Sequence, residues 1–236
     1  MSRGPLAVHW GAPPAVAPRA GTVDQVRIEV ENAGALSWAA GTFVSYHWLD
    51  SRDNPIVWDG IRTPAPHLAP GESAIVEAKV RGPMPPGPYR LAFDMVAELR
   101  AWFSELGSPM LPQDVDVADR TGEPSAPLPA GFERAPDWEE RVRAAHAEGY
   151  GVVAGAVDWA SGLLHRRPRE LAPYVPGPGR MPGFSAPLLA PSLLPGIELE
   201  PLGKIVGLPA FAAPREEPWI YDGRIVLRKL GGKPQQ

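Results

Sequence analysis

The chain has 236 residues, 44% of them hydrophobic and 21% charged, which is enough for two globular domains or one large one. Its net charge of −4 and pI near 5.8 give no support to a nucleic-acid-binding surface. The absence of cysteine excludes disulfides and thiolate metal sites and is typical of a reducing compartment, which favours the cytoplasm. The first ten residues lack the apolar core of a signal peptide, and no apolar run reaches about 18 residues, so we expect no membrane span.

Alternation of apolar and polar residues predicts strands throughout the first half. Val26 to Val30 place their apolar side chains on one face, and residues 74–80 and 89–95 repeat the pattern, with Asp94 on the polar face. Proline and glycine corners separate these runs. Short strands at this spacing predict an immunoglobulin-like antiparallel β-sandwich over residues 1–118, with seven or eight strands.

Several runs in this half resemble the four-tryptophan (FW) domain of the autophagy receptor "next to BRCA1". They are Glu31-Asn32-Ala33-Gly34 followed by Trp38, Leu68-Ala69-Pro70-Gly71-Glu72, and Pro86-Gly87-Pro88-Tyr89-Arg90-Leu91. The resemblance covers about residues 22–118. Segments 46–50 and 57–60 look like the bacterial version, which is appended to glycosyltransferases and methyltransferases. One departure is that Phe93 stands where the family has a tryptophan.

The resemblance implies an immunoglobulin-like sandwich that binds partner proteins and has no catalytic role. The bacterial version also implies a place in cell-envelope or glycan metabolism. Both statements rest on the likeness alone, because a fold hosts many functions.

Four tryptophans of this half allow two interpretations. Large rings can fill the sandwich, and this is what we expect of Trp38 and Trp102. Exposed rings can instead stack on sugars or anchor a partner. Both interpretations stay open for Trp48 and Trp58, which flank a predicted hairpin loop from Asp50 to Pro55. The candidate ligand-binding residues at this loop are Tyr46, Trp48, Asp50 and Trp58. The loop's acidic spacing lacks the glycine and distal glutamate of a calcium site, so it predicts an ordinary turn.

The second half predicts a linker over residues 119–136 and a proline-rich α+β extension over residues 137–236. A helix begins at Asp137, with Glu140 completing a capping box, and ends at Gly149. An apolar run from Val152 to Val157 then predicts a fully buried strand.

Frequent prolines between Pro168 and Pro218 exclude long helices and central strands there. Trp219 to Leu227 predicts a terminal hairpin around Asp222-Gly223. One helix, one strand and one hairpin make an incomplete domain, so we expect them to wrap the core of the sandwich. Docking onto a partner chain is the alternative.

Motifs for catalysis are missing. No glycine-rich phosphate loop and no Gly-x-Ser-x-Gly elbow occur, and the five histidines are scattered, so we expect no catalytic residue, metal or cofactor. A basic cluster contains Arg166, Arg167 and Arg169, which could clamp a phosphate or sugar acid, although a solvated turn is favoured. Asp158 ends the buried strand, where α/β folds place catalytic carboxylates, and a turn residue is favoured there too.

Three functions follow from these patterns. The favoured one is a non-catalytic interaction module that binds a partner protein or a polysaccharide through exposed aromatic rings. The second is the accessory or catalytic part of a sugar-modifying transferase, with Asp158 beside the arginines of the basic cluster. The third is a structural subunit of a larger assembly, which apolar exposure between Leu188 and Ile205 would support.

Overall fold

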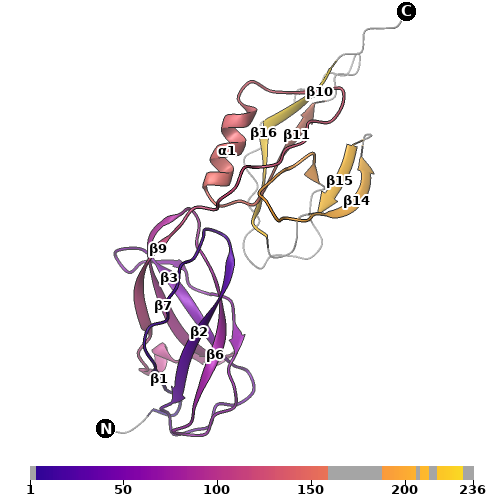
Figure 1. Ribbon diagram of the computed structural model, residues 1–236. Coiled ribbons are helices and arrows are strands. Elements are labelled where there is room, and N and C mark those ends of the chain that lie inside the picture. The colour runs from indigo at the N-terminus through magenta and orange to yellow at the C-terminus, as the bar shows by residue number, and fades with distance from the viewer. Residues whose placement is uncertain (1–3, 159–187, 206–207, 213–216, 231–236) are drawn as a thin grey trace, which may run out of the picture. The chain divides into compact units, whose positions relative to one another are not determined.

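The computed structural model describes residues 4–158, 188–205, 208–212 and 217–230. The chain is mainly β and divides into two compact units, Met1–Ala118 and Asp119–Gln236 (Figure 1). Each unit has its own sheets and is described by itself.

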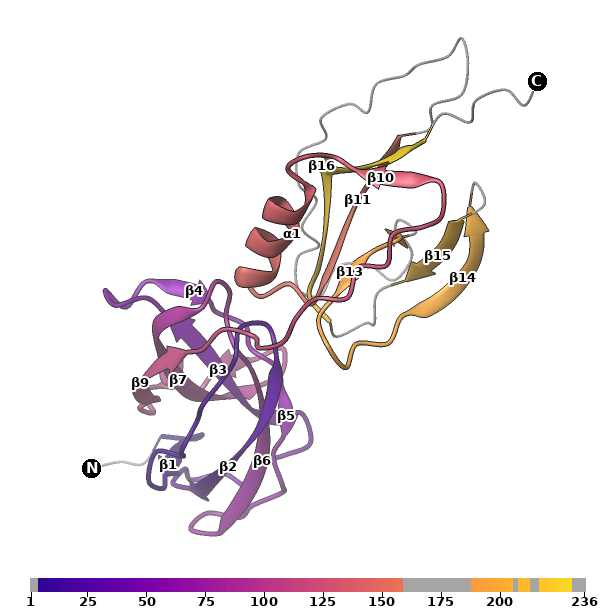
Figure 2. The ribbon, with the colours of Figure 1, turned by 45° about the horizontal axis from the view of Figure 1, so that its top comes forward.

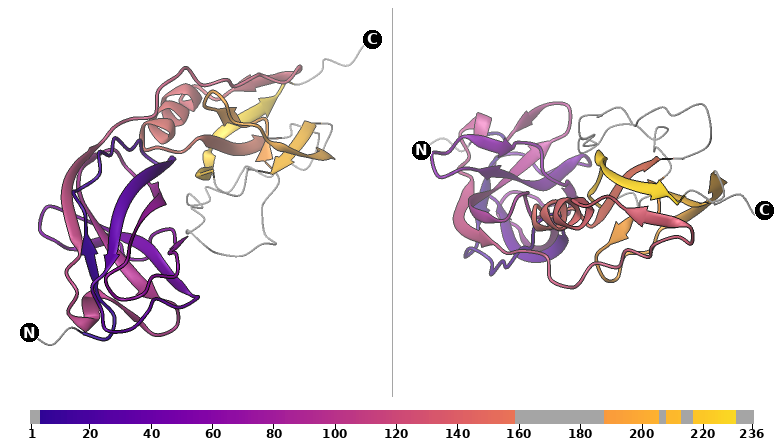
Figure 3. Two further views of the ribbon diagram at one scale, coloured as in Figure 1. Left: turned by 60° about the horizontal axis from the view of Figure 1, so that its bottom comes forward. Right: turned by 90° about the horizontal axis from the view of Figure 1, so that it is seen from above.

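Unit 1 is built from nine strands among its described residues and one short 3-10 helix. They are β1 (Val8–Trp10), β2 (Val23–Asn32), β3 (Thr42–Leu49), β4 (Pro55–Val57), β5 (Thr63–Pro64), β6 (Ser73–Arg81), β7 (Gly87–Ala97), β8 (Ala101–Trp102), β9 (Leu111–Val117) and η1 (Ser104–Leu106). One sheet has the order β1-β2-β6, and the other has the order β4-β3-β7-β8, with β5 beside β3 and β9 beside β7. All of these pairs are antiparallel. The two layers can be followed in Figure 3.

This division of strands between two layers is that of an immunoglobulin-like sandwich, which confirms the predicted fold class. The Tyr89 hydroxyl donates a hydrogen bond to the Pro85 carbonyl at 2.7 Å, four residues upstream at the start of β7. This is the tyrosine corner that recurs in immunoglobulin-like domains.

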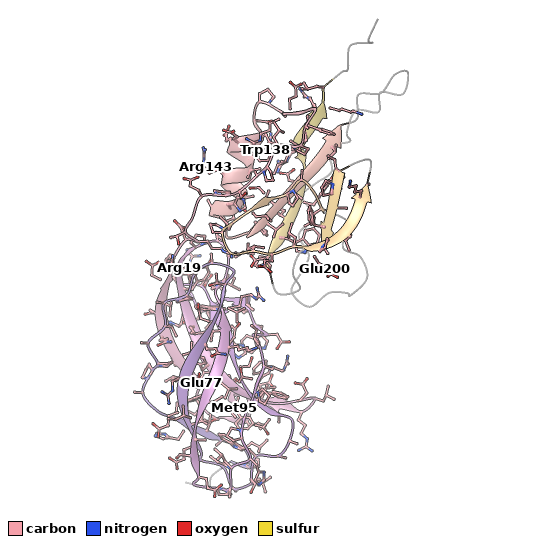
Figure 4. All side chains as sticks on the ribbon, turned by 45° about the vertical axis from the view of Figure 1, so that its right-hand side comes forward. Arg19, Glu77, Met95, Trp138, Arg143 and Glu200 are labelled. Atoms are coloured by element: carbon pink, nitrogen blue, oxygen red, sulfur yellow. The ribbon has the colours of Figure 1, made fainter. Side chains whose placement is uncertain are left out.

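The core of unit 1 lies between the two layers. Apolar side chains of β2 and β7 meet there, and Figure 4 labels Met95 among them. Trp38 is fully buried and contacts Phe103 edge-to-face, with ring centroids 6.1 Å apart. The core placement of Trp38 is therefore confirmed. Trp102, which we also expected in the core, is half-buried on the outer face of the second sheet, and Phe103 occupies the core instead.

The alternation rule is wrong for Asp94. It predicts a solvated carboxylate on the polar face of β7, but Asp94 is fully buried. The reason is that this sheet is covered on both faces. Residues 58–62 and 102–104 lie over the outer face of β3 and β7, as the contacts of His47 and Asp94 show.

Unit 2 contains one α-helix and seven strands among its described residues. They are β10 (Phe132–Arg134), α1 (Trp138–Ala147), β11 (Val152–Asp158), β12 (Leu188–Leu189), β13 (Ser192–Leu193), β14 (Glu200–Ile205), β15 (Leu208–Ala212) and β16 (Trp219–Lys229). One sheet has the order β10-β16-β11-β13 and the other β12-β15-β14. Helix α1 lies beside β16 and β11 (Figure 2), and Figure 4 labels its Trp138.

Helix α1 buries Trp138, Val142 and Ala145, which lie on one stripe at helical spacing. His146 follows Val142 by four residues, lies on the same face and is buried as well. The capping box does not form. Asp137 occupies the N-cap position, but its carboxylate makes no capping hydrogen bond and accepts one from Arg141 at 2.7 Å.

The predicted terminal hairpin is wrong. Residues Trp219–Lys229 form one continuous strand, β16, which pairs parallel with β11 on both sides of an irregularity. Gly155 pairs with Asp222 and the next residue pairs with Val226, so the Asp-Gly sequence produces a bulge instead of a turn. A Cβ atom at Gly155 would lie 1.9 Å from the Ile225 carbonyl oxygen, so only glycine allows the bulge to pack this closely.

The segment expected to be a linker contains β10, and Phe132 within it is buried. Unit 2 also has apolar side chains of its own in its interior, among them Val152, Ala154 and Leu188. The second half thus has apolar core residues of its own, and its expected packing on the sandwich stays a prediction. None of the helices within the described residues has the length and apolarity to cross a bilayer.

Candidate functional site

The outer face of the β3–β7 sheet carries an aromatic cluster, which we call the Trp58 platform. It consists of the Trp58 ring together with His47, Trp102 and Arg62, which surround it. Trp58 has 44% of its surface exposed, whereas His47 beneath it is fully buried. Tryptophan is enriched at interfaces, because it offers a large apolar ring together with a polar N–H.

The rings of the platform hold one another in fixed orientations. Trp58 stacks on His47 with centroids 3.9 Å apart and planes inclined by 17°. The Trp102 ring is inclined by 61° to His47 and by 69° to Trp58, with centroid distances of 4.5 Å and 6.2 Å. Because Trp102 lies nearer to His47 than to Trp58, it flanks the buried side of the stack. The outer face of the Trp58 indole is therefore left uncovered.

A buried polar chain lies beneath the stack. His47 Nδ1 is hydrogen-bonded to the backbone carbonyl of Trp58, and His47 Nε2 lies 3.4 Å from Asp94 Oδ2. Asp94 also accepts hydrogen bonds from the Ser104 hydroxyl at 2.5 Å and the Met95 backbone N–H at 2.7 Å. Since a carbonyl oxygen only accepts, Nδ1 of His47 carries a hydrogen. The chain fixes the ring on which Trp58 rests.

The backbone around Trp58 is pinned to β3. β4 and β5 both pair with β3, and the residues that connect them run along its edge. The Gly60 N–H donates to the Tyr46 carbonyl at 3.1 Å, and the Ser45 hydroxyl donates to the Gly60 carbonyl at 3.2 Å. A Cβ atom at Gly60 would lie 2.5 Å from the Tyr46 carbonyl oxygen, so glycine is what permits this close approach. The platform is thus held by backbone as well as by ring contacts.

Charged side chains form the rim of the platform. The Arg62 guanidinium lies 5.8 Å from the centre of the Trp102 ring, a cation–π contact. It also forms ion pairs with Asp59 at 2.9 Å and Glu98 at 2.8 Å. The rim therefore offers hydrogen-bond donors and acceptors, with one guanidinium paired to two carboxylates.

Of the candidate ligand-binding residues at the hairpin loop, Trp58 alone presents its ring to solvent. Trp48 is fully buried, and its indole Nε1 donates to the Arg81 carbonyl at 2.8 Å. Tyr46 is also buried, and burial raises the pKa of its hydroxyl. The interpretation of Trp48 and Tyr46 as ligand-binding residues is therefore wrong, because both fill the space between the sheets.

Asp50 is used by its own turn. Its carboxylate accepts hydrogen bonds from the Asn54 side chain at 2.9 Å and from the backbone N–H groups of Asn54 and Arg52 at 2.8 Å each. The hydrogen bond from the Asn54 side chain is the main cause that lowers the pKa of Asp50. This confirms the ordinary turn and removes Asp50 from the candidate site.

The remaining candidates belong to the second half of the chain. Arg166, Arg167 and Arg169 lie outside the described residues. Asp158 is the last residue of β11, where its backbone pairs with Arg228. The transferase hypothesis thus stays a prediction.

His47, Asp94 and Arg62 were missed by the sequence interpretation. A signal for His47 and Asp94 exists. In the register of β3 and β7, Ser45 pairs with Asp94 and His47 pairs with Ala92, so Ser45, His47 and Asp94 lie on one face of the sheet. Polar residues within strands that are otherwise apolar indicate a covered polar cluster.

A hollow lies on the other sheet of unit 1, lined by His9, Gly11, Glu29, Glu31 and Ser73. Within the described part of the chain, no group of three or more His, Asp or Glu side chains is placed to hold a metal ion. The hollow therefore offers a polar surface without the ligand set of a metal site.

Comparison with known proteins adds little to this geometry. No family model and no curated protein matches the sequence. Among solved structures, a CARDB domain from Pyrococcus furiosus, determined with di-metal ions, is 16% identical, covers 50% of this chain and 96% of its own, and has a TM-score of 0.31. A protein assigned as ApaA from Bordetella pertussis is 19% identical over 50% of this chain and 99% of its own, with a TM-score of 0.24.

A family 123 glycoside hydrolase from Clostridium perfringens is 12% identical over 60% of this chain and 33% of its own, with a TM-score of 0.23. Likenesses at this level carry no argument about function. The site must therefore be interpreted from its own residues.

Proposed function

We propose that unit 1 is a non-catalytic interaction module that binds its ligand on the Trp58 platform. The observation that carries the proposal is the position of the Trp58 ring, 44% exposed and stacked at 3.9 Å on a buried histidine. Tryptophan is enriched among the residues that dominate binding energy.

The platform is preorganised for binding. Holding an exposed tryptophan in one orientation before the ligand arrives reduces the entropy that is lost on binding. His47 supports the ring from below and also bonds the Trp58 backbone carbonyl, so both the side chain and the backbone of Trp58 are restrained. A merely accidental exposed ring would not need this support.

The polar groups below the platform support a binding role over catalysis. His47 and Asp94 are fully buried, so the ligand would touch the indole and not the imidazole or the carboxylate. Their hydrogen bonds are directed at the protein itself, to the backbone of Trp58 and Met95 and to Ser104. Within this proposal they act as positioning residues.

Two ligand classes fit an exposed indole: a partner protein and a polysaccharide. A glycan array and a pull-down from the native source, both with the full chain, test for them together. The expected result is at least one ligand that is lost in Trp58→Ala. The matched control is Ile75→Ala, which removes an exposed apolar side chain from the opposite sheet of unit 1.

Thermal melting of both variants shows whether the fold is intact. Trp58→Ala is expected to melt within a few degrees of the parent protein, because the ring is on the surface. Ligands that bind Trp58→Ala and the parent protein equally would contradict the proposed function.

A further inference from the structure

We infer that the ligand of the Trp58 platform is a neutral glycan whose pyranose ring stacks on the open face of Trp58. This inference rests on the proposed function and specifies its ligand. Three features of the platform carry it: its shape, its charge and its surroundings.

The shape of the platform is a single flat face. His47 covers the inner side of the Trp58 indole, and Trp102 flanks His47 instead of standing over the outer side. Two perpendicular indoles that both faced a common space would form a cage for an alkylammonium group. Here the face of Trp102 is instead occupied by the Arg62 guanidinium, at 5.8 Å. One open indole face matches the flat side of a pyranose ring, whose polarised C–H groups meet the negative π-face.

The charge of the rim favours a neutral ligand. Arg62 is the cation of the platform, and it is already paired with both Asp59 and Glu98. A sugar acid or sulfated glycan would have to displace one carboxylate and approach the other. Hydroxyl groups meet no such obstacle, since they donate to carboxylates and accept from guanidinium N–H groups without separating the ion pairs.

The surroundings of the platform favour a glycan over a protein surface. Charged residues are depleted at the centres of protein–protein interfaces. Trp58 is followed directly by Asp59, whose carboxylate is largely exposed, and the side chain next to Trp102 in the platform is the charged Arg62. The platform therefore combines an aromatic face with paired charges around it. A carbohydrate matches both, because it has apolar C–H groups as well as hydroxyl groups.

Isothermal titration with neutral hexasaccharides tests the inference. The probes are cellohexaose, laminarihexaose, mannohexaose and chitohexaose, with oligogalacturonate as the anionic comparison and a proline-rich peptide as the peptide comparison. We expect at least one neutral probe to bind the full chain and both comparisons to fail. Trp58→Ala should weaken the binding by about tenfold or more, and Trp58→Tyr, which keeps a flat ring, should retain most of it.

Ile75→Ala, on the opposite sheet, should bind like the parent protein. The indole N–H resonance of Trp58, followed by NMR during the titration, reports contact even if Trp58→Ala folds poorly. The glycan inference would be overturned, and the proposed function left standing, if Trp58 bound oligogalacturonate or the peptide. The same holds if every ligand that depends on Trp58 proved to be a protein. If no ligand of any class depends on Trp58, both the inference and the proposed function fail.

Discussion

A hydrogen bond between Trp48 on β3 and Arg81 at the end of β6 joins the two sheets of unit 1. The buried indole Nε1 of Trp48 donates to the Arg81 carbonyl oxygen at 2.8 Å. Tyr46, two residues earlier, approaches the same residue, because its hydroxyl accepts from the Arg81 backbone N–H at 2.8 Å. Two aromatic side chains of one layer therefore hold the backbone of the other, which explains why neither is available to a ligand.

Trp48→Ala is therefore expected to destabilise unit 1 and not to act on binding alone. Loss of a fully buried tryptophan leaves a cavity and removes the partner of the Arg81 carbonyl, at a cost of about 3–5 kcal/mol in the free energy of unfolding. Chemical denaturation of the full chain measures it. An unchanged denaturation midpoint in this variant would show that Trp48 is not part of the core.

Asp94→Ala tests the buried polar chain beneath the platform. The change leaves the Met95 N–H and the Ser104 hydroxyl without their acceptor, and an unsatisfied buried donor costs about 1–3 kcal/mol. It also removes the carboxylate next to His47. We expect lower stability and a Trp58 ring that is less well held, measured as stronger quenching of tryptophan fluorescence by acrylamide.

Asp114→Ala is the matched control for this experiment. Asp114 is a carboxylate on the adjacent strand β9, but it is largely exposed and pairs with Arg90 at the surface. Exposed ion pairs contribute little to stability, so this variant should unfold and quench like the parent protein. Equal behaviour of the two variants would mean that the buried chain does not position Trp58.

Truncation after Ala118 should leave a folded domain. The buried residues of the sandwich core all come from positions 8–117, and the unit has both of its sheets within residues 1–118. A fragment of residues 1–118 should therefore show a cooperative thermal transition and the dispersed NMR spectrum of a β-protein. Insoluble or unfolded product would show that unit 1 depends on the rest of the chain.

The fold of unit 1 could be predicted because its signals are local. Strict alternation in β2 and β6 marks the face of each strand, and proline–glycine corners mark where the strands end. Unit 2 could not be predicted in the same way. The Asp222-Gly223 pair is a strong hairpin signal by itself, but β11 pairs with β16 on both sides of it and extends the strand through a bulge. Such a long-range pairing has no signature in a short sequence window.

The candidate site could be predicted only in part, for the same reason. A tryptophan next to a turn is equally compatible with burial and exposure. Trp48 and Trp58 differ in the parts of the folded chain that cover them. Trp48 points between the layers, whereas Trp58 lies over the outer face of β3, where it rests on His47. The burial of Asp94 depends on Ser104, which reaches it from beyond β8. None of these contacts follows from the periodicity of a single strand.

In unit 2, His146 on helix α1 makes stability depend on pH. Its Nδ1 lies 2.7 Å from the Tyr150 carbonyl, and its Nε2 lies 2.9 Å from the Ser192 hydroxyl. Because the carbonyl only accepts, Nδ1 carries the hydrogen and Nε2 of the neutral ring accepts from Ser192. Burial is the main cause that lowers the pKa of His146. The nearby charge of Arg120 lowers it further, and the Tyr150 hydrogen bond acts in the opposite direction.

The sign of the effect follows from this lowered pKa. Below the ordinary histidine pKa of about 6.5, the unfolded chain binds a proton at His146 more readily than the folded chain does. The stability contributed by the neutral ring is therefore fully present above that pH. It is lost as the pH falls toward the lower pKa of the folded state. We expect the melting temperature of the transition that involves α1 to drop between about pH 7.5 and 5.5. His146→Gln should reduce this drop, whereas His67→Gln, which changes an exposed histidine, should not. Equal pH dependence in the two variants would show that His146 is not the titrating group.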